Sequence, residues 1–198
     1  MSLSDFFNRT VEYKNKLIYE SMDWMKDRSQ VISQNIVKEM SSRTEKVSRW
    51  GHIYQFVYEA KTKSKLKYYD FFPMSIVLEK YKDGFLGINL HYLPLTMRFM
   101  FMEQLWKYVS TQTEDFDDDT RIILRYKMLK TISGKKYFRP CLKRYLYSHM
   151  KTPMYHIPAN KWMYAMILPS SKFFNSQDNI IPNKLVYMDS RNDILNNK

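Results

Sequence analysis

The sequence predicts an α+β fold: a small antiparallel β-barrel of the SH3-like type with a helical insertion and an N-terminal helical arm. Three observations predict it. Apolar side chains recur at helical spacing over residues 1–49, the period becomes that of strands after Trp50, and helical spacing returns over residues 95–150. At 198 residues the chain can bury one core without disulfide bonds or a metal ion.

Residues 1–49 are predicted to form the arm. Ser4 stands at a suitable N-cap position, and neither glycine nor proline occurs before Trp50. Apolar side chains recur about every third, fourth or seventh position and form one stripe. We expect the stripe to dock either on neighbouring subunits or on the chain's own body. It consists of Phe7, Val11, Ile18, Met22, Met25, Ile32, Ile36 and Met40.

Residues 50–175 are predicted to form the barrel core. Runs rich in β-branched and aromatic side chains predict antiparallel strands at residues 53–58, 74–78 and 85–93, and Asp83-Gly84 predicts a hairpin turn between the second and the third. Two further strands, at residues 154–157 and 162–168, are expected to pair with the first three and complete the barrel.

The helical insertion is predicted over residues 95–150. Apolar spacing predicts helices that begin at Leu95, at the acidic cluster 117–119 and at Pro140, with Gly134 ending the second helix. Residues 176–198 are polar and rich in asparagine, and we expect them to form a C-terminal tail.

Positive charge is concentrated in one part of the chain. The formal net charge is +12, and residues 121–177, here called the acid-free window, contain twelve Lys or Arg and no Asp or Glu. Cations beside aromatic rings are typical of surfaces that bind phosphates and stack on bases, and such a surface can also meet an acidic protein. The candidate residues for either role are Arg121, Arg125, Lys127, Lys130, Lys135, Lys136, Arg139, Lys143, Arg144 and Lys151.

No arrangement in the sequence indicates an active site, so we predict that the protein is not an enzyme. Five carboxylates between Glu114 and Asp119 lack the ligand spacing of a calcium loop and fit the first turn of a helix. The histidines are dispersed, and the single cysteine, Cys141, is interpreted as a buried structural thiol. We expect no catalytic residues, metal, cofactor or small-molecule substrate. No apolar run is long enough to predict a membrane span.

Two strings in the core are distinctive. They read Tyr68-Tyr69-Asp70-Phe71-Phe72-Pro73 and Gly84-Phe85-Leu86-Gly87-Ile88-Asn89-Leu90-His91-Tyr92-Leu93-Pro94. With the residues that continue the pattern over about 137–169, they resemble a small family of virion structural or assembly proteins of contractile-tailed, T4-like phages, some described as DNA end protectors. The resemblance covers about residues 50–190, and Lys67 stands where the pattern predicts proline.

The second string also has a structural interpretation. Gly87, Asn89 and Tyr92 are interpreted as residues that shape a strand, and His91 as a hydrogen-bonded core histidine.

The resemblance implies a protein that acts by attachment, with other virion proteins as partners, in a virion assembled in the host cytoplasm. The first hypothesis is a non-enzymatic structural or assembly subunit of the tail, baseplate or neck, which docks through its arm and its basic face. The alternative is a DNA end-binding protein of the packaging machinery, with DNA as its partner. A nuclease-like barrel protein is a minor alternative.

Overall fold

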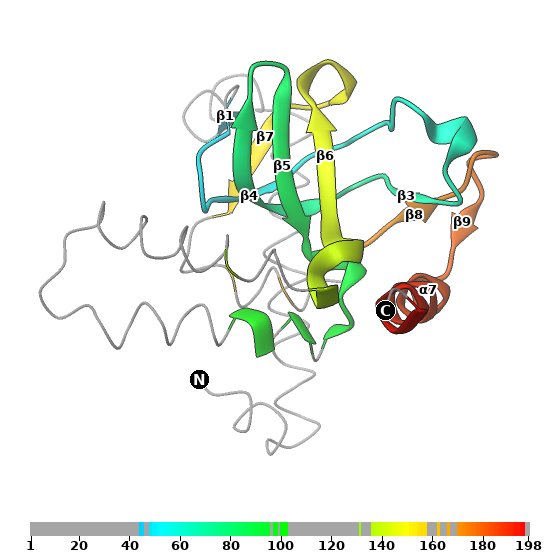
Figure 1. The fold of residues 1–198 in the computed structure, drawn as a ribbon. Coiled ribbons are helices and arrows are strands. Elements are labelled where there is room, and N and C mark those ends of the chain that lie inside the picture. The colour runs from blue at the N-terminus through cyan, green and yellow to red at the C-terminus, as the bar shows by residue number, and fades with distance from the viewer. Residues whose placement is uncertain are drawn as a thin grey trace, which may run out of the picture.

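The computed structural model of the chain describes residues 44–45, 48–95, 97–98, 100–102, 131, 136–157, 162, 166 and 170–196. In these residues two antiparallel β-sheets lie beside short 3-10 helices and a C-terminal α-helix (Figure 1). The predicted α+β class with antiparallel strands is therefore confirmed. The predicted arm residues between Phe7 and Met40 lie outside the described residues, as does nearly all of the helix expected from residue 117.

The larger sheet has six strands, paired antiparallel in the order β1-β7-β2-β4-β5-β6. Within the described residues β1 and β6 lie at its two edges, so the sheet does not close and the prediction of an SH3-like barrel is wrong. The reason is that β6 and β7 extend the central strands on opposite sides, β6 beside β5 and β7 beside β2. The strands are β1 (Thr44–Glu45), β2 (Ile53–Gln55), β4 (Met74–Tyr81), β5 (Gly84–Asn89), β6 (Leu142–Leu146) and β7 (Met154–Ile157).

The predicted hairpin and the predicted pairing of residues 154–157 are both confirmed. β4 and β5 pair up to Tyr81 opposite Gly84, with Lys82 and Asp83 in the turn, and β7 pairs with β2. Gly84 begins β5, where a side chain would collide with the carbonyl oxygen of Tyr145 in β6. The glycine is therefore needed for the close approach of β6 rather than for the turn itself.

The helix predicted to begin at Pro140 is wrong. The chain forms the 3-10 helix η3 (Lys136–Cys141), then strand β6, then the 3-10 helix η4 (Tyr147–His149). Apolar residues in this segment fit helical spacing, but the edge of β5 offers backbone hydrogen-bond partners along the whole of β6. A tertiary contact therefore overrides the local pattern.

Two further predictions on local structure have opposite outcomes. The helix expected from Leu95 is confirmed at residues 95, 97–98 and 100–102, and the amide of Arg98 donates to the carbonyl oxygen of Pro94. The strand expected over residues 162–168 is wrong at its two described positions, Trp162 and Met166, which are helical.

The smaller sheet connects the C-terminal part of the chain to the core. Its strands β3 (Tyr69–Asp70), β8 (Phe173–Phe174) and β9 (Ile180–Ile181) lie in the order β3-β8-β9, and helix α7 (Asn183–Asn196) follows. Val186 of α7 is buried in the core. Most of the segment expected as a polar tail thus forms a strand and a helix that pack on the body. The sequence signal for α7 is weak because polar side chains surround most of the helix.

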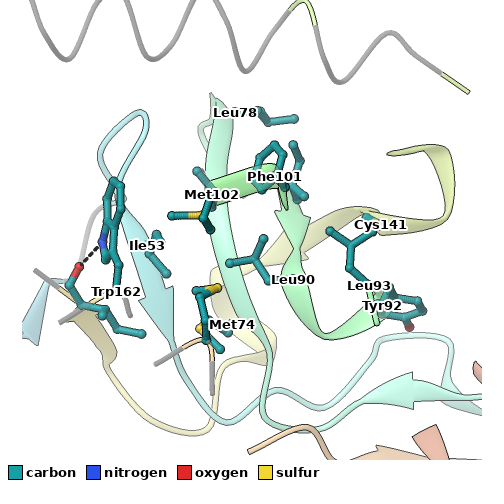
Figure 2. Close-up of a cluster of buried hydrophobic side chains, with 14 of the residues drawn as sticks. Ile53, Met74, Leu78, Leu90, Tyr92, Leu93, Phe101, Met102, Cys141 and Trp162 are labelled. Atoms are coloured by element: carbon teal, nitrogen blue, oxygen red, sulfur yellow. Dashed lines mark hydrogen bonds between the residues drawn. The ribbon is translucent and has the colours of Figure 1, made fainter. Parts of the chain in front are cut away.

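Apolar side chains cover both faces of the larger sheet. On one face, residues of β2 and β4 such as Ile53 and Met74 pack with Leu90 of η2 (Leu90–Tyr92) and with Met102 (Figure 2). The other face carries a mainly aromatic cluster, in which Tyr145 packs edge-on against neighbouring rings at centroid distances of 4.9 and 5.2 Å. Burial on both faces fixes the register of the central strands, because a one-residue slip would exchange the two sets of side chains.

Cys141 belongs to the first of these clusters. Its side chain is almost fully buried, and burial raises the pKa of the thiol to about 12. The prediction of a buried structural thiol is confirmed, since a thiol with so high a pKa forms little thiolate near neutral pH.

Gly87 offers a test of the close packing between β4 and β5. A methyl group added there would lie 2.8 Å from the carbonyl oxygen of Ile76 and would also meet the hydroxyl of Ser75. Because backbone cannot move aside as a flexible side chain does, we expect Gly87→Ala to lower the free energy of unfolding by about 1–3 kcal/mol. Chemical denaturation of both proteins measures the difference. An unchanged unfolding midpoint would contradict this packing.

Candidate nucleic-acid interface

The structure describes only part of the basic set that the sequence singles out. Arg139 precedes β6 and Lys151 follows η4, so these two residues lie beyond opposite ends of β6, whereas Lys143 and Arg144 lie within it. Successive strand residues point to opposite faces, so the side chains of Lys143 and Arg144 diverge. Only the backbone of Lys136 is described, and the residues outside the described part are Arg121, Arg125, Lys127, Lys130 and Lys135.

Lys143 takes part in packing. Its Nζ atom lies 4.1 Å from the centre of the Tyr92 ring, and burial lowers the pKa of the ammonium group. Tyr92 is itself buried. Lys143 therefore stabilises the contact between β6 and η2 and is less available to a phosphate than an exposed lysine.

Lys151 belongs to a cluster of mixed charge. Its Nζ atom lies 2.8 Å from Glu59, which is also 3.1 Å from Lys63, and Lys63 lies 3.4 Å from Asp178. Hydrogen bonds from Lys151 and Lys63 lower the pKa of Glu59 to about 2. Glu59 therefore stays ionised at neutral pH, and its negative charge offsets part of the positive potential that a phosphate would meet.

Arg144 lies at the end of the β4–β5 hairpin. Its guanidinium carbon is 4.3 Å from the centre of the Tyr81 ring, and its Nη2 atom donates to the carboxylate of Asp83 in the turn. On the same hairpin, Nζ of Lys80 lies 5.7 Å from the centre of the Trp50 ring. Two aromatic rings therefore each lie beside a cation. We call the set of Trp50, Lys80, Tyr81, Lys82 and Arg144 the hairpin-tip surface.

Four of these five residues were not among the sequence candidates. A usable signal exists in Lys80-Tyr81-Lys82, where a ring stands between two cations immediately before the turn. The neighbouring Glu79 and Asp83 conceal this signal in any count of net charge. In the structure those carboxylates are bound locally, since Glu79 accepts a hydrogen bond of 3.1 Å from the hydroxyl of Tyr81 and Asp83 accepts from Arg144.

A buried polar network lies where the two sheets meet. Asp70 of β3 accepts hydrogen bonds from the backbone amide of Phe72 (3.1 Å) and from the side-chain amide of Asn89 (2.9 Å). Its Oδ2 atom lies 2.8 Å from Nδ1 of His91 in η2, and Nε2 of His91 lies 3.1 Å from the hydroxyl of Ser170. The prediction that His91 is a hydrogen-bonded core histidine is confirmed.

The imidazole of His91 is neutral at pH 7. Burial lowers its pKa below the usual 6.5, and this effect outweighs the opposite effect of Asp70. Nδ1–H therefore donates to the Asp70 carboxylate, and Nε2 accepts from the hydroxyl of Ser170. The contact between His91 and Asp70 is a hydrogen bond to a carboxylate and not an ion pair.

These contacts follow the order Ser-His-Asp that hydrolases use in nucleophilic catalysis. All three residues are buried, with exposed fractions of 0% for His91, 3% for Asp70 and 7% for Ser170, so a substrate cannot reach them. A substrate carbonyl needs direct access to the serine oxygen. We therefore interpret the network as structural.

Arg98 extends the network to α7. Its guanidinium donates to the carbonyl oxygens of Leu93 (2.8 Å) and His91 (3.3 Å) and to the hydroxyl of Tyr187 (3.0 Å). The helical residues after Pro94, the turn η2 and helix α7 are thereby held together. Sequence patterns did not single out Arg98, because an isolated arginine in a helix resembles any solvated one.

The described residues include no cluster of three or more His, Cys, Asp or Glu side chains that could hold a metal ion. None of the helices in the described part of the chain combines the length and the apolar character that crossing a membrane requires.

Comparison with known protein families identifies a family for the chain. The sequence model of the family described as "Phage T4 terminal DNA protecting protein" matches residues 5–190. The match includes the two strings of the core, the acid-free window and the hairpin-tip surface. Neither the curated proteins nor the solved structures contain a match to the chain.

The buried His91 predicts a pH dependence of stability. In the unfolded chain His91 binds a proton near its usual pKa of 6.5, whereas the folded chain resists protonation there. The free energy of unfolding should therefore fall as the pH drops below 6.5, with a slope of up to about 1.4 kcal/mol per pH unit for this one group. In His91→Gln, which keeps a neutral donor and acceptor, that contribution should disappear.

Denaturation at several pH values between about 7 and 5 compares the two slopes. The other three histidines are present in both proteins, so the difference in slope isolates His91. Parallel slopes would show that His91 does not resist protonation.

Proposed function

The chain belongs to the family of phage T4 terminal DNA protecting proteins, and from this membership we propose that it binds the ends of linear phage DNA and shields them from exonucleases. Protection of this kind is steric, since a protein seated on an end excludes the nuclease from it. The proposal therefore assigns no catalytic residue, metal or cofactor to the chain. It places the chain at the ends of the genome, in the virion or during its assembly.

The match of the family over residues 5–190 is the observation that carries this proposal, and the charge distribution of the chain supports it. Twelve cations without a carboxylate in residues 121–177 suit a partner of dense negative charge, and DNA is such a partner. Contacts of lysine and arginine with phosphates release counterions and carry no sequence information. Binding without sequence information suits a protein that acts on DNA ends of any sequence.

The hypothesis of a tail or baseplate subunit finds no support in the family, which favours the end-binding alternative. Contacts with other virion proteins stay part of the proposal, because the sequence predicts an apolar stripe between Phe7 and Met40 of the kind that docks on a partner. The mixed-charge cluster around Glu59 is less suited to DNA than the acid-free window, because its carboxylates repel phosphates.

Exonuclease protection tests the proposal directly. The full chain should slow the digestion of a linear duplex by an exonuclease that starts at double-stranded ends. Its affinity for that duplex should fall at least about tenfold between 50 and 200 mM salt, because several phosphate contacts are lost. Digestion at the unprotected rate, with saturating protein at low salt, would contradict the proposal.

A matched pair of variants tests the role of the acid-free window. Replacing Lys130, Lys135 and Lys136 with Gln should weaken binding and reduce the slope of log affinity against log salt by about 0.9 for each phosphate contact removed. The control replaces Lys184, Arg191 and Lys198 with Gln, which removes the same charge from a segment that also carries Asp189 and Asp193. Equal losses in both variants would show that net charge alone, and not the window, determines binding.

A further inference from the structure

Two pairs of a ring and a cation flank the tip of the β4–β5 hairpin, one on each face. Lys80 and Tyr81 are consecutive strand residues, so their side chains point to opposite faces. Lys80 lies opposite Phe85 of the aromatic cluster and approaches the Trp50 ring at 5.7 Å. On the other face, Tyr81 lies 4.3 Å from the guanidinium carbon of Arg144.

Both rings are exposed although most aromatic side chains in the described part of the chain are buried or half-buried. Trp50 is 52% exposed and Tyr81 41%. Large rings that stay in water are enriched at surfaces that bind partners, where a ring gives a broad contact area at a small loss of conformational entropy. A cation beside each ring adds a donor for phosphate at the same place.

Three backbone contacts hold the segments that carry the rings. The amide of Gly51 donates to the carbonyl oxygen of Val77 (2.9 Å), and the amide of Tyr147 donates to the carbonyl oxygen of Asp83 in the turn (3.0 Å). On the β6 side, the backbone of Gly84 lies too close to Tyr145 to admit a side chain. The rings are therefore presented on a preorganised support, which reduces the entropy lost on binding.

The local charge also suits DNA. Lys80, Lys82 and Arg144 lie at the tip, together with the two carboxylates of Glu79 and Asp83, and both carboxylates accept hydrogen bonds from residues of the tip. The excess of positive charge thus lies beside two rings, one next to Lys80 and the other next to Arg144.

At the end of a duplex the two bases of the last pair can separate and expose their flat faces, whereas interior bases are covered by their neighbours on both sides. We propose that the hairpin tip is a wedge for a DNA end: it enters between the two bases of the terminal pair, with Trp50 against one base and Tyr81 against the other. The neighbouring cations of the hairpin-tip surface contact the terminal phosphates. This inference rests on the proposed function, because it assumes that the chain binds DNA ends.

The two-sided arrangement is what distinguishes a wedge from a flat cap. Rings on one face would stack together on an intact terminal pair, whereas rings on opposite faces each meet one of two separated bases. Separation requires unpairing of the last base pair, so an end whose bases are already unpaired should bind more tightly.

Three duplexes of the same central sequence test the wedge: one with both ends closed by hairpin loops, one with blunt ends, and one with a few unpaired bases at each end. At a single salt concentration the full chain should bind the forked duplex most tightly and the closed duplex most weakly. The double variant Trp50→Ala/Tyr81→Ala should bind all three with the affinity of the closed duplex, a loss of about tenfold or more at the forked end.

Two further variants control for indirect effects. Trp50→Phe/Tyr81→Phe keeps both rings and should keep the order of the three affinities. Leu185→Ala/Met188→Ala removes two exposed apolar side chains from α7, which are 50% and 51% exposed, and should bind as the wild-type chain does. Unfolding curves of all variants identify any that lose stability.

The outcomes separate this inference from the proposed function. If the wild-type chain binds the closed duplex as tightly as the open ones, the proposed function fails. If the wild-type chain prefers open ends and the double alanine variant keeps that preference at wild-type affinity, the wedge is wrong while the proposed function stands. A wild-type preference for blunt over forked ends also overturns the wedge, since the rings would then cap an intact pair.

Discussion

The buried carboxylate of Asp70 constrains the rest of the described fold. A carboxylate removed from water lowers stability by several kcal/mol unless hydrogen bonds replace its hydration. Its donors here are the amide of Phe72, the side chain of Asn89 at the end of β5, and His91 in η2. Because Asn89 and His91 lie in a different segment from Asp70, few placements of β3 relative to β5 and η2 satisfy the carboxylate. The two distinctive strings of the sequence, residues 68–73 and 84–94, therefore supply the residues of one hydrogen-bond network.

The network fixes one end of β5, and the hairpin-tip surface, which we propose contacts DNA, lies at the other. Asn89 closes β5 next to Asp70, whereas Gly84 opens it beside the hairpin turn. Glycines at positions 84 and 87 let β5 lie close against β6 and β4 respectively. Polar contacts fix one end of β5, and close backbone packing fixes the rest of the strand. The position of the hairpin tip relative to the core is therefore fixed as well. Stability and presentation of the tip thus depend on the same strand.

Sequence reasoning predicted what depends on local patterns. The β4–β5 hairpin follows from Asp83-Gly84, the helix start from Leu95 after a proline, and the core role of His91 from its apolar surroundings. Sequence reasoning failed where contacts with residues far away in the sequence determine the local structure. The apolar spacing of residues 142–146 fits a helix, but these residues form a strand because they pair with the free edge of β5. Helix α7 buries Val186 although its sequence has no strong apolar stripe. The basic residues were chosen by counting charges along the sequence. Such a count includes Lys143, which packs over Tyr92. It overlooks Lys80 and Lys82, because the neighbouring Glu79 and Asp83 cancel their charge in the count.

An end protector has to solve a problem of numbers that cations alone do not solve. Phosphate contacts are the same along the whole duplex, so a purely cationic surface would distribute the protein over the interior sites, which greatly outnumber the two ends. Discrimination needs a contact that only an end provides, and the exposed face of a base is such a contact. Our two proposals assign these requirements to different elements. They assign general affinity to the acid-free window and the preference for ends to the exposed rings of Trp50 and Tyr81. Neither proposal assigns a reaction to the chain, and the Ser170-His91-Asp70 contacts are buried within the fold.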